Sequence, residues 1–227
     1  MRPHTVLNIA ISIDGKVTTR DRKFHAFGGE EDQDLMEKLR ASADAVMIGA
    51  GTLRDEDPLL TIRTTRRIKK RLREKRSAQP HAVVVSRSLD FPLESSRFFA
   101  CADARRFVCT GKDAPSARVA AIRPYAEVVQ VPVTGKSGLD LRTVAQRLAA
   151  RGIERLLLEG GGHLNFEMMA AGLVDECYVT LCPFVIGGDG APTAFDGLGF
   201  DASGVRELKL SSARRGQAGR VFLHYKA

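Results

Sequence analysis

LLLEGGGHLNFEMMAAGLVDE, the stretch from Leu156 to Glu176, places three consecutive glycines between an apolar run and a helical pattern that Gly172 ends. This order predicts a strand, a bend and a helix. Glycine backbones adopt positive φ and approach a ligand closely, and the first N–H groups of a helix attract anions. The stretch therefore indicates a phosphate site, although a tight turn without a ligand would also use glycine here.

The same alternation of strand and helix runs through most of the chain. The strand candidates are short apolar runs bounded by Gly, Asp or Pro: Val6–Ile11, Ala45–Ile48, Ala82–Val85, Phe107–Cys109, Val128–Val131 and Leu156–Leu158. The helix candidates carry apolar residues at helical spacing: Glu31–Ala43, Asp140–Arg151 and Leu164–Ala171. Asp140 is the expected N-cap of the second helix and Gly152 its C-terminal stop. The alternation predicts an α/β fold with a mostly parallel central sheet flanked by helices.

The C-terminal part follows a different pattern. Glu176–Pro183, Arg206–Ser211 and Arg220–Tyr225 are predicted strands without long helices between them. Such strands favour an antiparallel edge of the sheet that ends in a hairpin.

Length and composition favour one domain over residues 1–227, because 227 residues with 44% hydrophobic and 27% charged residues are typical of a folded soluble chain. No apolar run approaches the roughly 20 residues of a membrane helix. The first residues predict a strand rather than a secretory signal. The four cysteines (Cys101, Cys109, Cys177 and Cys182) form no C-x-x-C pair or zinc spacing. We therefore expect no metal site, no membrane association and reduced, buried thiols in a cytoplasmic protein.

The net charge of +8 comes from one segment. Arg63–Arg76, RTTRRIKKRLREKR, holds nine Lys/Arg and one Glu, whereas the remainder of the chain is neutral with 26 basic and 26 acidic residues. This segment fits a solvated helix or flexible loop, a surface that attracts phosphate or other polyanions, or a nucleic-acid-binding arm. It contains no aromatic residue, so stacking on nucleic-acid bases is poorly supported.

A second stretch, Val46–Arg63, couples a predicted strand to polar groups. The segment that follows the strand contains Thr52, the acidic residues Asp55–Asp57 and a turn at Pro58. Loops after the carboxyl ends of parallel strands line ligand sites. Thr52 is suited to hydrogen-bond a ligand there, and Arg63 to hold a phosphate through two parallel bonds. The acidic residues also fit an exposed turn.

A third candidate is Ser86 with Arg87, at the end of the predicted strand Ala82–Val85. A hydroxyl and a planar cation suit a ribose 2′-phosphate, although an exposed arginine after a strand needs no ligand.

The remaining motif, Ala10–Val17, places Ser12, Asp14 and Lys16 around a predicted turn at Gly15. Asp-Gly is a common turn pair, so this motif alone has low specificity.

The sequence contains no G-x-S-x-G and no H-E-x-x-H motif, which leaves little support for a hydrolase.

Three motifs together resemble the pyrimidine reductase family of riboflavin biosynthesis. They are ISIDGK from Ile11, RASADAVMIGAGTLRDEDPLLTIR from Arg40, and LLLEGGGHLNFEMMAAGLVDECYVTLCPFVIGGDGAPT from Leu156. Their order and spacing fit the family over about residues 5 to 225. The resemblance implies a dihydrofolate-reductase-like fold, a homodimer and a stand-alone reductase. Such an enzyme uses NADPH to reduce a ribosylaminopyrimidine 5′-phosphate to the ribitylamino product, by hydride transfer to C1′ of an open-chain imine.

The resemblance also implies roles for single residues. The implied cofactor contacts are Thr52, Glu56, Ser86, Arg87, Gly161, Gly162, His163 and Leu164. Ser86 and Arg87 would meet the adenosine phosphate, and the residues from Gly161 to Leu164 the diphosphate. The implied substrate contacts are Leu60, Arg63 and Glu159. Arg63 would bind the 5′-phosphate, and Glu159 would accept N–H donors of the diaminopyrimidine.

The chain departs from the family pattern at two contacts. The family usually has Asp where Glu56 stands, so this contact shifts by one methylene or passes to Asp57. The family usually has Asp-Ser where Ser86-Arg87 stands, so the ligand of the 2′-phosphate stays open.

The proton donor and the substrate class stay open as well. The catalytic proton donor is unassigned, with Asp14, Lys16, Glu159 and ordered water as candidates. A reductase of the same fold acting on another substrate, such as a pteridine or dihydrofolate, fits the same motifs. A basic nucleic-acid-binding protein acting through residues 63–76 is a different class of function that the charge permits, but it leaves the three glycines unexplained. We therefore expect a small phosphorylated molecule, rather than a nucleic acid, as the partner.

Overall fold

The structure is a computed structural model that describes residues 1–23, 27–100, 103–134 and 138–227. The chain forms two compact units. The first unit comprises Met1–His4 and Arg40–Leu157, and the second comprises Thr5–Leu39 and Leu158–Ala227. The prediction of one domain stays a prediction.

The strands of the first unit carry most of its core. In spatial order they are β8 (Arg155–Leu158), β2 (Ala45–Gly49), β3 (His81–Val85), β4 (Arg106–Gly111) and β5 (Glu127–Val131). The pairs from β2 to β5 are parallel. The central residues of these strands are buried, as expected for continuous apolar runs with both faces covered.

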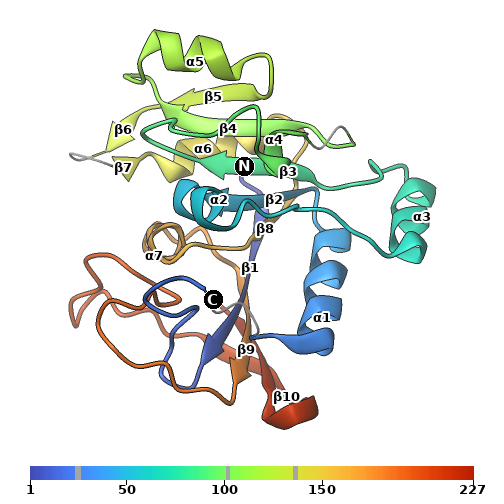
Figure 1. Cartoon of the computed structure of the whole chain (residues 1–227), viewed down its shortest axis with the longest axis vertical. Helices are drawn as coiled ribbons and strands as arrows, with labels where there is room; N and C mark the ends of the chain where they lie inside the picture. Colours follow the sequence, from blue (N-terminus) through green and yellow to red (C-terminus); the bar gives the residue numbers. More distant parts are fainter. Residues whose placement is uncertain (24–26, 101–102, 135–137) are drawn as a thin grey trace. The chain divides into compact units, whose positions relative to one another are not determined.

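Helices and short segments complete the first unit (Figure 1). They are α2 (Ala50–Glu56), α3 (Thr65–Arg73), α4 (Arg97–Ala100), α5 (Ser116–Ile122), α6 (Leu141–Ala149) and the small pair β6 (Val133–Thr134) and β7 (Gly138–Leu139). The predicted caps of α6 are confirmed: the Asp140 carboxylate accepts a bond from the backbone N–H of Thr143 at 3.1 Å, and Gly152 has a φ of +85°.

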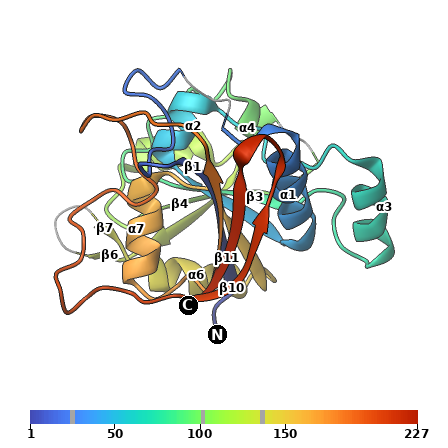
Figure 2. The ribbon, with the colours of Figure 1, turned by 90° about the horizontal axis from the view of Figure 1, so that it is seen from below.

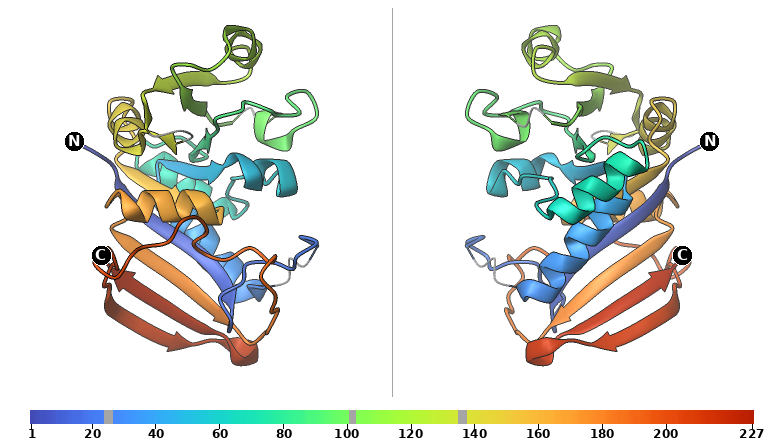
Figure 3. Two further views of the ribbon diagram at one scale, coloured as in Figure 1. Left: turned by 90° about the vertical axis from the view of Figure 1, so that its left-hand side faces the viewer. Right: turned by 90° about the vertical axis from the view of Figure 1, so that its right-hand side faces the viewer.

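The second unit has a mixed set of strands, in the order β10 (Lys209–Arg215), β11 (Val221–Lys226), β9 (Glu176–Cys182) and β1 (His4–Ser12). β1 and β9 are parallel, whereas β11 is antiparallel to both of its neighbours. Figure 2 shows β10 and β11 as a terminal hairpin, and Figure 3 shows β9, β11 and β10 in succession. The unit also holds α7 (Gly162–Ala170), a short 3-10 turn at Gln217–Gly219 and most of α1 (Gly29–Ser42).

The predicted fold class, a mostly parallel sheet with helices and an antiparallel C-terminal edge, is confirmed. Most element boundaries differ from the prediction by one or more residues, and three differences matter here. The last strand but one is Lys209–Arg215, three to four residues later than predicted, because all its residues are exposed and no apolar periodicity marks its ends. α7 begins at Gly162 rather than Leu164. The acidic residues Asp55 and Glu56 end a helix, α2, rather than forming a turn.

In the part of the chain that the structure describes, no helix has the length and apolar character needed to cross a bilayer. Cys109, Cys177 and Cys182 are buried free thiols, as predicted, and Cys101 lies outside the described residues. Burial raises the pKa of the Cys109 thiol to about 12, so this group is unreactive at neutral pH.

Candidate active site

The glycine bend of the second unit joins β8 to α7. Gly160 has a φ of +98°, a conformation that favours glycine. Gly161 precedes the helix with extended backbone and is joined to Gly160 by a cis peptide bond. The N-cap residue of this nine-residue helix, Gly161, has no side chain that could accept a bond from the first N–H groups, and among the described residues no such cap bond is formed. This end of α7 has the chemistry of an anion site.

Gly162 is required for a different reason, which is packing. A Cβ atom on Gly162 would lie 2.4 Å from Asp196 Oδ2 and 2.6 Å from the carbonyl oxygen of Thr193. The loop that carries these two residues is held by Asn165 of α7, whose buried Nδ2 donates to the carbonyl of Ala194 at 2.9 Å. Two of the three glycines thus have reasons within the protein, so the phosphate hypothesis rests on the uncapped helix end more than on the glycine count.

The Ser12–Asp14–Lys16 motif forms the predicted turn, with Gly15 at a φ of +79°. The Asp14 carboxylate accepts bonds from Ser12 Oγ at 2.7 Å and from the backbone N–H groups of Ile186 and Gly187 at 3.1 and 2.6 Å. These bonds, that of Ser12 first, lower the pKa of Asp14 to about 2. Asp14 is therefore ionised at neutral pH, which suits an anchor for the loop after β9 better than a proton donor.

This anchor has a testable pH dependence. A carboxyl whose pKa is lowered by folding stabilises the folded state above its unfolded pKa of about 3.9, and that stabilisation is lost as pH falls through about 2. We expect Asp14→Asn to lower the melting temperature at pH 6, and the difference from the unmodified chain to shrink steadily below pH 4. Asp189→Asn, at an exposed site in the same unit, is the control. A constant difference from pH 6 to pH 2.5 would contradict the assignment.

Sequence reasoning missed a half-buried acid in the second unit. Asp32, in the first turn of α1, accepts a hydrogen bond from the buried hydroxyl of Thr180 on β9, at 2.5 Å. Desolvation, with a smaller contribution from the negative charge of Glu159, raises the pKa of Asp32, while Thr180 and Arg220 oppose the rise. The carboxyl belongs to the surroundings of Glu159, a predicted substrate contact. Nothing in the sequence marked it, because Asp32 and Thr180 are 148 positions apart.

In the first unit, the predicted residues after β2 and β3 share one edge of the sheet. β2 and β3 are parallel with Gly49 opposite Val85, so the segments that follow them leave the sheet on the same side. Thr52 is half-buried in α2 and Glu56 is exposed. The strands thus bring Thr52 and Ser86 to the same edge, as expected of a ligand-binding edge in a parallel sheet.

Asp57 is already engaged within the protein. Its carboxylate accepts bonds from Ser96 Oγ at 2.6 Å and from the backbone N–H groups of Arg97 and Phe98 at 2.6 and 3.2 Å. These donors lower the pKa of Asp57 against the effect of its burial. The carboxylate holds the start of α4, so the structure gives Asp57 a role within the protein.

The segment from Leu59 to Arg63 has no regular structure but is firmly held. The buried Arg40 donates through Nη1 to the carbonyls of Leu59 and Thr61 at 3.0 and 3.1 Å. The buried amide of Gln79 pairs with both the N–H and the carbonyl of Ile62, at 2.7 and 3.0 Å.

Of the two predicted substrate contacts in this segment, Leu60 has a buried side chain and Arg63 an exposed one. Arg40 and Gln79 position the segment from Leu59 to Arg63 through bonds to its backbone. No local sequence pattern indicated that these two side chains have this role.

Ser86 and Arg87 lie at the end of β3, as predicted. The buried Ser86 Oγ accepts the backbone N–H of Leu89 at 3.0 Å. Arg87 forms a two-bond ion pair with Asp113, at 2.5 and 3.0 Å, directly over Gly111. A ligand phosphate at Arg87 would therefore share the guanidinium with a resident carboxylate.

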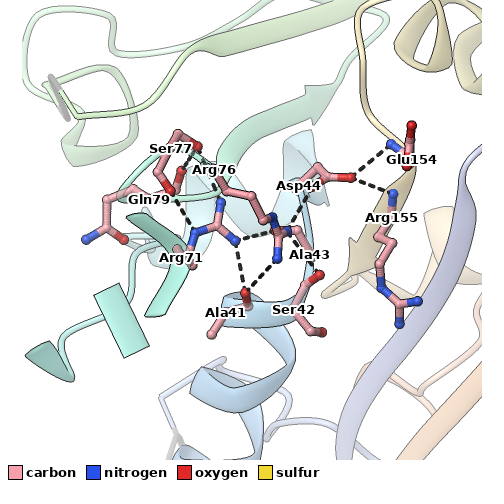
Figure 4. Close-up of polar contacts among 10 residues, drawn as sticks. All are labelled: Ala41, Ser42, Ala43, Asp44, Arg71, Arg76, Ser77, Gln79, Glu154 and Arg155. Carbon is pink, nitrogen blue, oxygen red and sulfur yellow. Dashed lines mark hydrogen bonds and ion pairs between the residues drawn. The ribbon is translucent and has the colours of Figure 1, made fainter. Parts of the chain in front are cut away.

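The basic segment is mostly a helix, α3, and two of its arginines are structural. Arg71, only 1% exposed, donates through Nη1 to the carbonyls of Ala41 and Ala43 at 3.0 and 2.6 Å, and through Nε to that of Ser77 at 2.8 Å (Figure 4). Burial, with the charge of Arg76, lowers the pKa of Arg71 to about 10, so Arg71 stays charged at neutral pH.

Arg76 donates to the carbonyls of Ala41 and Ser42 at 3.2 and 3.0 Å and pairs with Asp44 at 2.8 Å. Together the two arginines satisfy carbonyls at the C-terminal end of α1, which a helix cannot satisfy by itself. We call Arg71 and Arg76 the arginine clamp.

Comparison with known proteins decides the family. The RibD C-terminal domain family matches residues 3–222. The chain belongs to this family. Members similar to it include 2,5-diamino-6-ribosylamino-4(3H)-pyrimidinone 5′-phosphate reductases of Methanothermobacter thermautotrophicus and Archaeoglobus fulgidus. They are 39% and 34% identical, over 93% and 88% of this chain and 93% and 89% of their own. The predicted resemblance to pyrimidine reductases is confirmed.

Solved structures agree on the fold of the family. A pyrimidine reductase-like protein of Corynebacterium diphtheriae has a TM-score of 0.82 at 24% identity, covering 99% of this chain and 91% of that one. A deaminase/reductase of Thermotoga maritima has a TM-score of 0.77 at 21% identity, covering 99% of this chain and 56% of the other. These structures confirm the predicted dihydrofolate-reductase-like α/β fold.

Proposed function

We propose that this RibD C-terminal domain protein is an NADPH-dependent reductase that converts a ribosylaminopyrimidine 5′-phosphate to the ribitylamino product. The observation that carries the proposal is the match to relatives named as this reductase over about nine-tenths of both chains. The proposal includes a homodimer located in the cytoplasm.

The residues present suit a dinucleotide phosphate. In the second unit, the uncapped end of α7 at Gly161, Gly162, His163 and Leu164 offers backbone N–H groups to a diphosphate. In the first unit, Ser86 and Arg87 offer a hydroxyl and a planar cation to a 2′-phosphate, and Thr52 and Glu56 offer polar groups from α2. We propose these eight residues as the cofactor contacts.

The proposed substrate contacts are chosen by chemistry. Glu159 follows β8 and accepts N–H donors of the diaminopyrimidine ring through its two oxygens. Arg63 follows the segment that Arg40 and Gln79 hold, and it binds the 5′-phosphate through a charge-assisted bond. Because the side chain of Leu60 is buried, its backbone is the part available for contact.

When bound, NADPH supplies the hydride that reaches C1′ of the open-chain imine. The chain supplies orientation and charge matching, and a proton reaches the imine nitrogen. Asp14 is held ionised, so Lys16, Glu159 and ordered water are the better candidates for the donor. Lys16 is itself positioned, since its Nζ donates to the carbonyl of Ala191 at 3.2 Å.

Turnover by the purified full chain tests this function. We expect NADPH oxidation with the ribosylaminopyrimidine 5′-phosphate, a product heavier by two hydrogens, and kcat/KM about 10-fold or more higher for NADPH than for NADH. Arg87→Ala should reduce this preference, with Arg123→Ala, at an exposed site of the same unit, as a control. Comparable efficiency with both cofactors would refute the role of Ser86 and Arg87, and turnover of a dihydropteridine or dihydrofolate instead would favour the alternative substrate class.

A further inference from the structure

The exposed side of α3 forms a charged surface that contains none of the proposed cofactor or substrate contacts, and α3 begins two residues after Arg63, the proposed contact of the 5′-phosphate. Thr65, Arg66, Lys69, Leu72 and Arg73 line a hollow of about 600 Å³. Arg66, Lys69 and Arg73 are spaced i, i+3 and i+7, so they share one face of the helix. We call these three residues the basic face. All five lining residues come from one helix, so the hollow is an open groove with no opposite wall.

The basic face consists of three exposed cations. Among the described residues, no carboxylate pairs with Arg66, Lys69 or Arg73, and the ion pair on this helix joins Lys70 to Glu74 at 3.7 Å, between exposed side chains. Lys69 and Arg73 are four residues apart, and like charges at this spacing destabilise a helix. A bound anion would remove that repulsion.

The arginine clamp presents the basic face on a fixed helix. Arg71 points from α3 into the protein, whereas the cations of the basic face point away from it. Figure 4 shows both clamp arginines converging on the end of α1. Two arginines of the segment Arg63–Arg76, the arginine clamp, therefore anchor it, while the three cations of the basic face are exposed.

The basic face lies away from the proposed cofactor contacts of the same unit. The clamp bonds to Ala41–Ala43 and Asp44, directly before the first residue of β2, whereas Thr52 comes after its last residue. Five strand residues span about 16 Å. Figure 1 shows α3 and α2 on opposite sides of the first unit's strands. The basic face is therefore a separate surface from the cofactor residues.

We propose that the basic face binds the phosphate backbone of a nucleic acid, without reading its sequence. Nucleic-acid interfaces are strongly positive and polar, and their phosphate contacts come from Arg, Lys and hydroxyl side chains. Protein interfaces centre on large apolar or aromatic side chains, whereas Leu72 is the one such residue lining this groove and the rest of its apolar surface comes from the stems of Thr, Lys and Arg side chains with polar or charged ends. The absence of an aromatic residue from 63–76 disfavours base stacking and so favours a duplex.

Binding of a labelled 20-base-pair DNA duplex to the full chain, followed by fluorescence anisotropy at 50 and 200 mM salt, tests the proposal. Three phosphate contacts predict a salt slope of about −2.7, or about 40-fold weaker binding at the higher salt. The triple variant Arg66→Gln, Lys69→Gln, Arg73→Gln should bind at least about 10-fold more weakly at 50 mM salt.

The matched control Lys112→Gln, Arg123→Gln, Arg142→Gln removes three exposed charges from the same unit and should change binding less than about two-fold. Melting curves establish that both variants are folded, and both should keep reductase turnover, so this proposal and the proposed function fail separately. No duplex binding at 50 mM salt, or an equal loss in the control variant, would overturn the proposal. Tighter binding of a polyglutamate peptide than of DNA would replace it with an acidic protein partner.

Discussion

Arg71→Met should lower the free energy of unfolding by about 3 kcal/mol or more, a large part of the roughly 5–15 kcal/mol that holds a domain folded. Methionine has a similar length and lacks the donors, so the carbonyls of Ala43 and Ser77 would lose their bonds from Arg71, and that of Ala41 would keep its bond from Arg76. Urea denaturation at pH 7 measures the difference.

Arg73→Met is the control, because this side chain lies two positions away on the exposed side of the same helix. We expect it to change the free energy of unfolding by less than about 0.5 kcal/mol. Arg71→Lys should be intermediate, since an ammonium group cannot reach the carbonyls of both segments as a planar fork does. Equal effects of Arg71→Met and Arg73→Met would show that the arginine clamp is not a structural element.

Glu159→Gln should lower kcat/KM for the pyrimidine substrate by about 100-fold or more. Glutamine keeps the size of the side chain, but its NH2 group replaces one carboxylate oxygen. This NH2 group would then face an N–H donor of the pyrimidine ring instead of accepting a bond from it. The dissociation constant for NADPH should change less than about two-fold. Steady-state kinetics and a fluorescence titration with NADPH provide the two measurements. A parallel loss of both affinities would contradict a role confined to the substrate.

Arg63→Ala separates recognition of the ring from recognition of the phosphate. Its KM for the substrate should rise about 10- to 100-fold, with little effect on NADPH binding. With the dephosphorylated substrate, the penalty of Arg63→Ala should disappear, whereas that of Glu159→Gln should persist. If Arg63→Ala stays impaired on the dephosphorylated substrate, its loss has another cause.

Local sequence patterns predicted the parts of the fold that local physics determines. Val83 and Val84 lie in a strand with both faces covered, so a continuous apolar run marked it. Asp140 caps a helix three residues from its bonding partner, within reach of a sequence pattern. β10 has no buried residue, and its boundaries were therefore misplaced.

The candidate site depends more on distant partners, which no local pattern shows. Asp14 bonds to Gly187, 173 positions away, so its motif predicted a turn but not the anchor. The charge of Arg63–Arg76 suggested a solvated or ligand-binding segment, and the buried Arg71 shows that part of it is structural. Burial of an arginine is determined by the carbonyls that surround it, and those belong to another element.

At Ala41, Ser42 and Ala43 the arginine clamp donates hydrogen bonds to main-chain carbonyl oxygens rather than to side chains. The contact between the arginine clamp and the end of α1 should consequently tolerate substitutions at these three positions wherever the new side chain finds space. Inserting or deleting a single residue there would rotate the oxygens away from both guanidinium groups. Evolution can thus vary the residue types of this junction freely but not its length.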